Sequence, residues 1–243
     1  MKQQGESRTS QSGFAFADCQ ISPKNVVRTS KILNENLWKS EFKTPTLIGV
    51  DEVGRGCLAG PVISCAFVFD ADLLEEQNQK IFQQKRFQLT DSKKLTSSQR
   101  DELFPYLQQH PHALGIASAQ EIDQINILQA TFLSMRRALQ TLLKQQPAYQ
   151  QSLLMVDGSF CIPGLNFKNH FAVIDGDQWV SSISAASILA KVTRDRMMEA
   201  LDEEIPGYDF GKHKGYGTKI HKEAIAKNGI TSQHRRSFKG VLL

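Results

Sequence analysis

The sequence has no apolar segment long enough to cross a membrane as a helix. Its longest apolar run, Val62 to Phe69, falls far short of the roughly 20 residues that such a helix needs. The polar N-terminus, MKQQGESRTS, also lacks the apolar stretch of a secretory signal. We therefore expect a cytoplasmic protein that does not bind membranes.

Cysteine is scarce, and its spacing contains no CxxC pair. This spacing argues against both a disulfide framework and a cysteine-rich zinc site. Reduced thiols are typical of cytoplasmic proteins. We interpret all four cysteines in this way: Cys19, Cys57, Cys65 and Cys161.

Acidic residues are nearly missing from the C-terminal segment, residues 208–243. It contains eight lysines and arginines and only two acids, a charge of +6 in a chain whose total is +4. A concentrated basic segment is typical of proteins that bind a polyanion. A solvated basic tail explains the same composition equally well.

The organisation of the chain predicts one folded domain behind an extension. Residues 1–43 are polar and rich in serine and glutamine, which predicts a largely disordered extension with a weak helix from Ser30 to Phe42. Residues 44–243 form the predicted domain, and its last part, about 208–243, is the basic segment. We detect no internal repeat.

Apolar patterning within the domain predicts a mixed α/β layer fold. A helix begins after Thr96, with Gln99 completing a capping box. A long amphipathic helix ends before Pro147, and a second one from Ser182 to Glu204 is rich in small residues that allow close packing. The predicted strands are residues 46–51, 61–69, 113–119, 153–156 and 171–174.

Three of the predicted strands end in acidic residues: Asp51-Glu52, Asp157, and the pair Asp175 and Asp177. The ends of neighbouring strands can converge at one edge of a sheet, where clustered carboxylates need a cation to offset their repulsion. Hard divalent cations prefer such oxygen ligands, and two of them can promote phosphoryl displacement. Each acid alone is explained as well by a turn or a helix cap.

A glycine-arginine-glycine turn directly follows the first acids. Gly54, Arg55 and Gly56 let backbone groups approach a ligand closely, whether a phosphate or a ribose 2′-hydroxyl, which distinguishes RNA from DNA. A tight turn between two strands is the alternative interpretation.

These motifs resemble those of the bacterial ribonuclease HII family, a type 2 ribonuclease H. The segments that carry the resemblance occur in the family's order and rough spacing over residues 46–240: GVDEVGRGCLAGPV, DSKKL, VDG, GD, SISAASILAKVTRDRMM, HKGYGTKIH and HRRSF. The Gly-Arg-Gly form favours this family over the sister family ribonuclease HIII. The resemblance implies a ribonuclease H-like fold, a mixed five-stranded sheet flanked by helices.

The same resemblance implies a metal-dependent endoribonuclease. Such enzymes cleave the RNA strand of RNA–DNA hybrids and cut 5′ of ribonucleotides embedded in duplex DNA, leaving 3′-hydroxyl and 5′-phosphate ends. The cofactor would be Mg²⁺ or Mn²⁺, and a monomer would suffice for the site. The resemblance implies four catalytic, metal-binding acids: Asp51, Glu52, Asp157 and Asp177.

One of these acids departs from the family pattern. Asp175-Gly176-Asp177-Gln178 stands where the family often has Lys-Gly-Asp-Ser, so Asp175 could replace or assist Asp177. We choose Asp177 because it follows the glycine. Asp195 is a further candidate ligand, although a helix acid paired with neighbouring arginines explains it better.

The resemblance also implies substrate contacts. Gly54, Arg55 and Gly56 would contact the 2′-hydroxyl at an RNA–DNA junction, and Tyr216 would stack on the next deoxyribose; a partly buried loop tyrosine is the alternative. His213 and His221 receive no role. The implied phosphate contacts are Lys93, Lys94, Lys191 and Arg194, of which the first two also fit a solvated turn.

Two other functions remain compatible with the residues. One is a non-catalytic protein that binds hybrids or structured RNA. The other is a different two-metal nuclease, such as a resolvase or integrase, which would cut DNA without a ribonucleotide.

Overall fold

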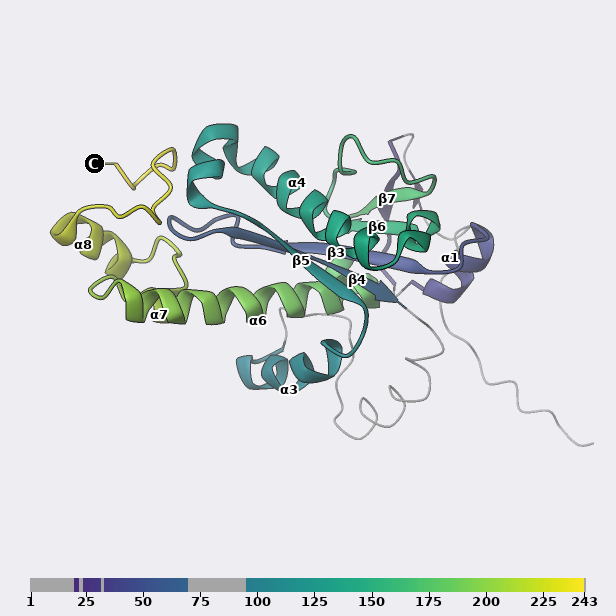
Figure 1. Ribbon diagram of the computed structural model, residues 1–243, viewed down its shortest axis with the longest axis horizontal. Coiled ribbons are helices and arrows are strands. Elements are labelled where there is room, and N and C mark those ends of the chain that lie inside the picture. The colour runs from purple at the N-terminus through teal and green to yellow at the C-terminus, as the bar shows by residue number, and fades with distance from the viewer. Residues whose placement is uncertain (1–19, 22–23, 32, 70–94, 243) are drawn as a thin grey trace, which may run out of the picture.

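The computed structural model describes residues 20–21, 24–31, 33–69 and 95–242. One mixed sheet lies at its centre, with helices packed on both faces (Figure 1). Among the described residues, no helix combines the length and apolarity required to cross a membrane.

The sheet contains the five strands predicted from the sequence. They are β3 (Leu47–Val53), β4 (Val62–Phe69), β5 (His112–Ala117), β6 (Leu153–Asp157) and β7 (His170–Val173). Their spatial order is β7-β6-β3-β4-β5. The strands β7, β6 and β3 run parallel, whereas β3, β4 and β5 are antiparallel neighbours. The carboxyl ends of β3 and β6, and hence Asp51 and Asp157, therefore lie at the same edge.

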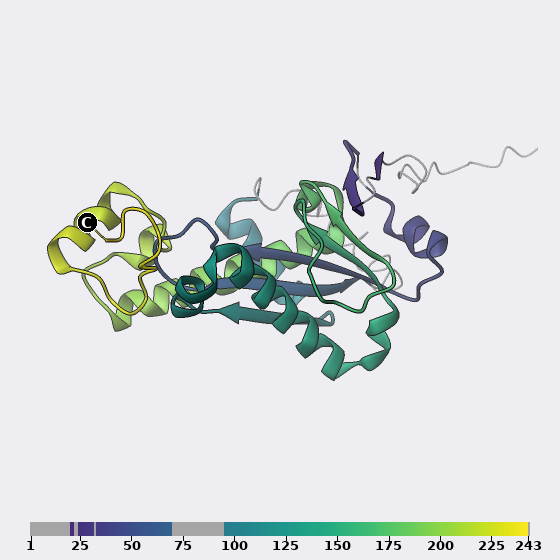
Figure 2. The same ribbon diagram turned by 90° about the horizontal axis from the view of Figure 1, so that it is seen from above.

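Two long helices cover opposite faces of this sheet, as Figure 2 shows from above. Helix α4 (Ala119–Gln145) contributes Met135 and Leu139 to a core with Ile48 and Val50 of β3. Helix α6 (Ser181–Glu204) packs alanines against β4 and against α3 (Ser97–Leu107) on the other face. The predicted capping box of Thr96 and Gln99 is present at the start of α3.

The small residues of α6 allow the helix to approach the sheet closely. A Cβ atom at Gly49 of β3 would lie 2.3 Å from the carbonyl carbon of Ser182, so only glycine fits. Burying small side chains in this way gains contact area at little cost in side-chain entropy. The predicted close packing of this helix is therefore confirmed, and it fixes α6 beside the edge where the acids lie.

Helix α4 is not continuous, unlike the predicted helix. Asn126 has φ 66° and ψ 165°, which breaks the helix. Its side-chain oxygen accepts hydrogen bonds from the backbone N–H groups of Leu128 and Gln129 and so caps the second part. The first part instead holds the C-terminal segment, because Asp123 accepts hydrogen bonds from Arg236 and Ser237.

The structure corrects the prediction of a disordered extension over residues 1–43. Strand β2 (Val26–Arg28) pairs with β7, and β1 (Gln20–Ile21) pairs with β2, which makes the sheet seven-stranded. Helix α1 (Glu35–Glu41) lies within the predicted weak helix and buries Trp38. Residues 1–19 lie outside the described part of the chain. This packing could not be predicted from the sequence, because the segment has few apolar residues and they are widely spaced.

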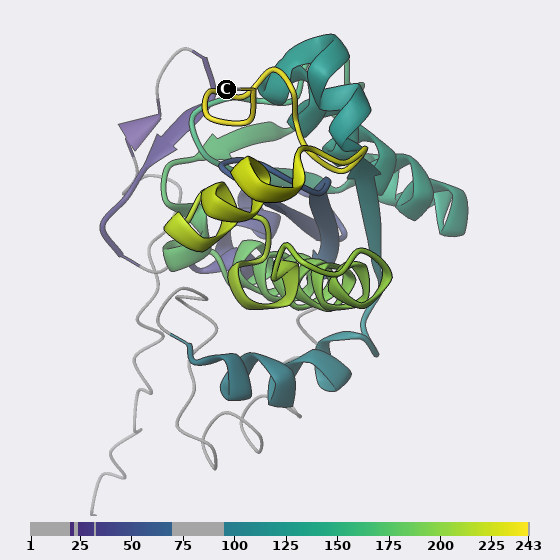
Figure 3. The same cartoon turned by 90° about the vertical axis from the view of Figure 1, so that its left-hand side faces the viewer.

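The basic C-terminal segment folds against the far end of α6. It contains α7 (Phe210–His213) and α8 (Lys219–Asn228), followed by a chain that returns to the sheet edge (Figure 3). Tyr208 and Phe210 bury their rings there with Met198 of α6. Two short elements complete the described fold: the 3-10 helix η2 (Pro147–Gln151) before β6, and α5 (Gly176–Trp179) before α6.

Candidate active site

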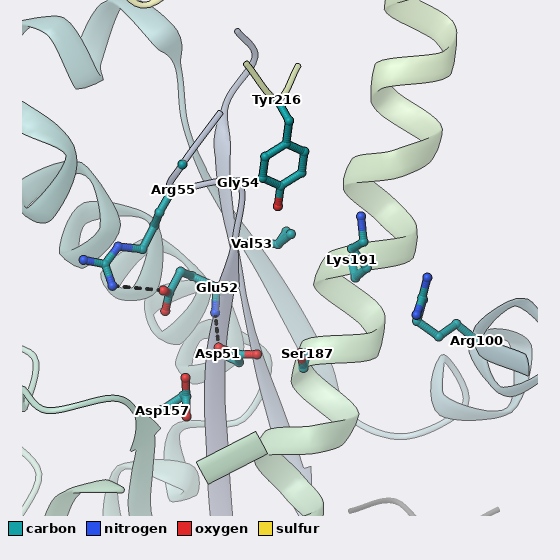
Figure 4. A pocket seen from close by; sticks show the side chains of 11 residues that line it. Asp51, Glu52, Val53, Gly54, Arg55, Arg100, Asp157, Ser187, Lys191 and Tyr216 are labelled. Atoms are coloured by element: carbon teal, nitrogen blue, oxygen red, sulfur yellow. Dashed lines mark hydrogen bonds and ion pairs between the residues drawn. The ribbon is translucent and has the colours of Figure 1, made fainter. Parts of the chain in front are cut away.

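A cavity of about 330 Å³ opens where β3 ends, between that strand and α6. Acidic side chains from β3 and β6 lie on one side of it, and basic side chains from α3 and α6 on the other (Figure 4). Its lining consists of Asp51, Glu52, Val53, Gly54, Arg55, Gly56, Arg100, Asp157, Ser187, Lys191 and Tyr216.

Asp51 is the most buried acid of this cavity, with 5% of its surface exposed. Its carboxylate accepts a hydrogen bond from the backbone N–H of Glu52 at 2.7 Å and another from the Ser187 side chain. Burial, followed by the carboxylates of Asp157 and Glu52, raises the pKa of Asp51 well above its usual range. A cation placed here would relieve that cost.

Glu52 and Asp157 contribute the other two carboxylates. Val50 of β3 is paired with Val156 of β6, so Asp51 and Asp157 lie at the same level of these neighbouring parallel strands. The side chain of Glu52 points toward the turn and forms an ion pair with Arg55 at 3.3 Å (Figure 4). The prediction that these strand ends bring Asp51, Glu52 and Asp157 together is confirmed.

Asp177 lies beside this group but does not line the cavity. It is buried in the short helix α5 (Gly176–Trp179), and its backbone N–H approaches Asp157 Oδ1 at 3.4 Å. Asp175 is exposed, with φ 52°. Of these two acids, Asp177 is the one in contact with the cavity's carboxylates.

The carboxylate set suits a hard cation held partly by water. Oxygen is the only type of donor that these acids offer, and Mg²⁺ typically uses one or two carboxylates and keeps several waters. Within the described ranges, no group of three or more acidic, histidine or cysteine side chains is arranged to hold one ion.

The glycine-arginine-glycine turn and Tyr216 form the outer part of the cavity. Backbone bridging pairs Cys57 with Tyr216, and the N–H of Leu58 donates to the carbonyl of Gly215 at 2.8 Å. Tyr216 is 42% exposed, and its hydroxyl points into the cavity above Val53 (Figure 4). Two segments far apart in the sequence therefore present one surface, as the motifs predict.

Arg194 is not in the position that a phosphate contact requires. Its side chain is completely buried and donates to the carbonyl oxygens of Pro61, Lys214 and Ala59 at 2.9, 2.8 and 3.1 Å. The prediction of a phosphate contact is therefore corrected: Arg194 holds the two outer segments together. A buried guanidinium needs several acceptors, and these carbonyls supply them.

Lys191 lines the cavity, as expected, and forms an ion pair with Asp195 at 2.7 Å. Asp195 is therefore a helix acid with a cationic partner, although that partner is a lysine rather than an arginine. Lys93 and Lys94 lie outside the described residues.

Sequence reasoning missed three contributors to this site. Ser187 donates to Asp51, and Arg100 of α3 lines the opposite wall. His221 is buried, and its Nδ1 donates to the carbonyl oxygen of Tyr216 at 2.9 Å. Ser187 is one of the small residues of the predicted helix, and His221 was considered in the sequence without receiving a role.

Comparison with known proteins identifies the family that this chain resembles. The family model described as Ribonuclease HII matches residues 48–241. Ribonuclease HII of Aliivibrio salmonicida is 50% identical over 217 residues, which cover 88% of this chain and 96% of that protein. Ribonuclease HII of Shewanella oneidensis is 47% identical over 206 residues, 82% of this chain and 90% of that protein.

Solved structures show the same fold. Ribonuclease H2 from Pyrococcus horikoshii superposes with a TM-score of 0.61 at 26% identity, covering 81% of this chain and 95% of that one. Bst-RNase HIII in complex with Mn²⁺ gives a TM-score of 0.64 at 18% identity, covering 88% of this chain and 73% of that one. The carboxylates, the glycine-arginine-glycine turn and Tyr216 all lie within the residues that the family model matches. This chain belongs to the ribonuclease HII family.

Proposed function

We propose that this protein is a metal-dependent endoribonuclease of type HII. It would cleave the RNA strand of RNA–DNA hybrids and cut 5′ of single ribonucleotides in duplex DNA, leaving 3′-hydroxyl and 5′-phosphate ends. The observation that carries this proposal is the meeting of Asp51, Glu52 and Asp157 in one cavity with the Gly54–Gly56 turn and Tyr216. The family membership and the activity named for the relatives support it.

Asp51 and Asp157, with Glu52, would hold Mg²⁺ or Mn²⁺, and Asp177 would complete the set. The similar structure of Bst-RNase HIII is a complex with Mn²⁺. When bound, such ions lower the pKa of an attacking water and stabilise the leaving oxyanion. The hydrogen bond from Ser187 orients Asp51, and the ion pair with Arg55 holds Glu52.

Substrate recognition would use the outer part of the cavity. Backbone groups of Gly54, Arg55 and Gly56 would contact the 2′-hydroxyl, and Tyr216 would stack on the following deoxyribose. Lys191, with Lys93 and Lys94, would contact phosphates. The exposed lysines of α8 add sequence-independent attraction to the duplex.

We also propose that the protein works in the cytoplasm, as a monomer. Cys57, Cys65 and Cys161 are free thiols, which fits the reducing cytoplasm. A monomer would suffice for this set of cavity residues.

The test is cleavage of a labelled RNA–DNA hybrid with Mg²⁺ or Mn²⁺, with a chelator as control. Wild-type protein should cut only with metal, and Asp51→Asn should abolish cutting while largely retaining hybrid affinity. Full activity of Asp51→Asn would overturn the site. Binding without cleavage by the wild type would favour a non-catalytic hybrid-binding protein, and ribonucleotide-independent cutting of DNA a different two-metal nuclease.

A further inference from the structure

Arg235 is a buried cation to which the proposed reaction gives no role. Its side chain has no exposed surface, although it lies in the basic C-terminal segment. Burial lowers its pKa to about 10, so the guanidinium remains charged at neutral pH. A buried charge of this kind is costly unless several hydrogen bonds compensate it.

Those hydrogen bonds go to the turn that lines the cavity. Arg235 Nη1 donates to the carbonyl oxygen of Arg55, and Nε donates to that of Gly60, both at 2.9 Å. The backbone N–H of Arg235 donates to the carbonyl oxygen of Leu58 at 2.8 Å. One residue therefore anchors the turn at Arg55 and the chain that follows it at Leu58 and Gly60.

The anchor on Arg55 also determines where the next N–H points. The peptide bond that joins Arg55 to Gly56 is trans, and in a trans peptide the C=O and N–H point in opposite directions. Because the Arg55 carbonyl points to the buried guanidinium, the N–H of Gly56 points away from it. Gly56 lines the cavity, and a Cβ atom there would meet nothing within 4 Å.

The same C-terminal segment connects the turn to Tyr216. His234 bridges Ala59, and its Nε2 lies 3.2 Å from Nε2 of His221, whose ring holds the Tyr216 carbonyl. His234 Nδ1 accepts a hydrogen bond from the N–H of Thr231, which makes Nε2 the donor toward His221. The turn and Tyr216 are thus both held by the C-terminal segment.

We propose that Arg235 is a specificity-determining positioning residue, which orients the Gly56 N–H toward the 2′-hydroxyl of a ribonucleotide at an RNA–DNA junction. This inference rests on the proposed function. Arg235 does not touch substrate; it acts through the Arg55–Gly56 peptide. A single embedded ribonucleotide offers one 2′-hydroxyl, so its cleavage depends on that orientation. A long hybrid offers a 2′-hydroxyl at every position and can bind in other registers.

The test compares kcat/KM for two substrates, a duplex with one embedded ribonucleotide and a long hybrid. Arg235→Lys keeps the charge but loses the planar fork that serves two carbonyls. We expect it to lower the ratio of embedded to hybrid cleavage at least tenfold. The control Arg196→Lys changes an exposed arginine of α6 that pairs with Asp101, and should leave the ratio within twofold.

An unchanged ratio in Arg235→Lys overturns the proposal, whether both activities persist or fall together. The hybrid activity reports on folding within the same experiment. If the wild type cuts neither substrate, the proposed function fails. Amide exchange of the wild type then tests the orientation alone. The Gly56 amide should exchange rapidly while that of Leu58 is protected. A protected Gly56 amide would contradict the orientation.

Discussion

Gly54 and Arg194 are in direct contact: a Cβ atom at position 54 would lie 2.3 Å from Nε of Arg194. Gly54 also has φ +94°, a conformation that residues with a side chain rarely adopt. The first glycine of the turn is therefore required by the buried arginine beneath it.

Gly54→Ala should destabilise the protein, because it combines backbone strain with overpacking. We expect a loss of about 3 kcal/mol in the free energy of unfolding. The matched control is Gly56→Ala, where space is open and φ is not positive. It should change that free energy by about 0.5 kcal/mol or less. Denaturant unfolding measures both, and equal losses would contradict the contact.

Asp177 and Asp175 should differ in their effect on activity. Asp177 is buried against Asp157, whereas Asp175 is exposed. Asp177→Asn should lower metal-dependent cleavage by at least about tenfold and raise the metal concentration for half-maximal rate. Asp175→Asn should stay within about twofold, because asparagine also tolerates positive φ. The reverse ranking in metal titrations would make Asp175 the fourth ligand.

Glu35 should make stability depend on pH. It is buried under the start of α6, where it accepts a hydrogen bond from the N–H of Ser182 at 2.9 Å. Burial raises its pKa from 4.5 to about 7. The folded state then binds more protons than the unfolded state between these values, so stability is greatest at low pH and falls as pH rises through 7.

Glu35→Gln removes this titration but can still accept the hydrogen bond. It should match the wild type near pH 4, below the unfolded pKa, and be more stable at pH 8, by at most about 3 kcal/mol. Comparing the two proteins cancels other titrations, including that of His234, whose burial lowers its pKa to about 4. A difference that is the same at both pH values would show that Glu35 does not titrate in this range.

The sequence predicted the parts of this structure that depend on local pattern. The five strands, the capping box at Thr96 and the acids at the ends of β3 and β6 follow from apolar periodicity and turn chemistry. The approach of Asp51 to Asp157 follows from parallel pairing. These features depend only on residues that are neighbours in the chain or in the sheet.

The parts that the sequence did not predict depend on distant backbone groups. Arg235 bonds the carbonyl of Gly60, 175 positions away, and Arg194 bonds that of Ala59, 135 positions away. No residue type marks a carbonyl that will accept from a buried guanidinium. The burial of Trp38 and the hydrogen bond of Glu35 likewise depend on the packing of α1 against the start of α6.

The cavity is proposed to recognise a ribonucleotide and to cut beside it with metal. The most direct test is a DNA duplex with one embedded ribonucleotide, incubated with Mg²⁺ or Mn²⁺ and, separately, with chelator. We expect a metal-dependent cut on the 5′ side of that ribonucleotide. No cut there, with long hybrids still cleaved, would keep the carboxylate site and contradict junction recognition by Gly56 and Tyr216. Cleavage of neither substrate would contradict the account as a whole.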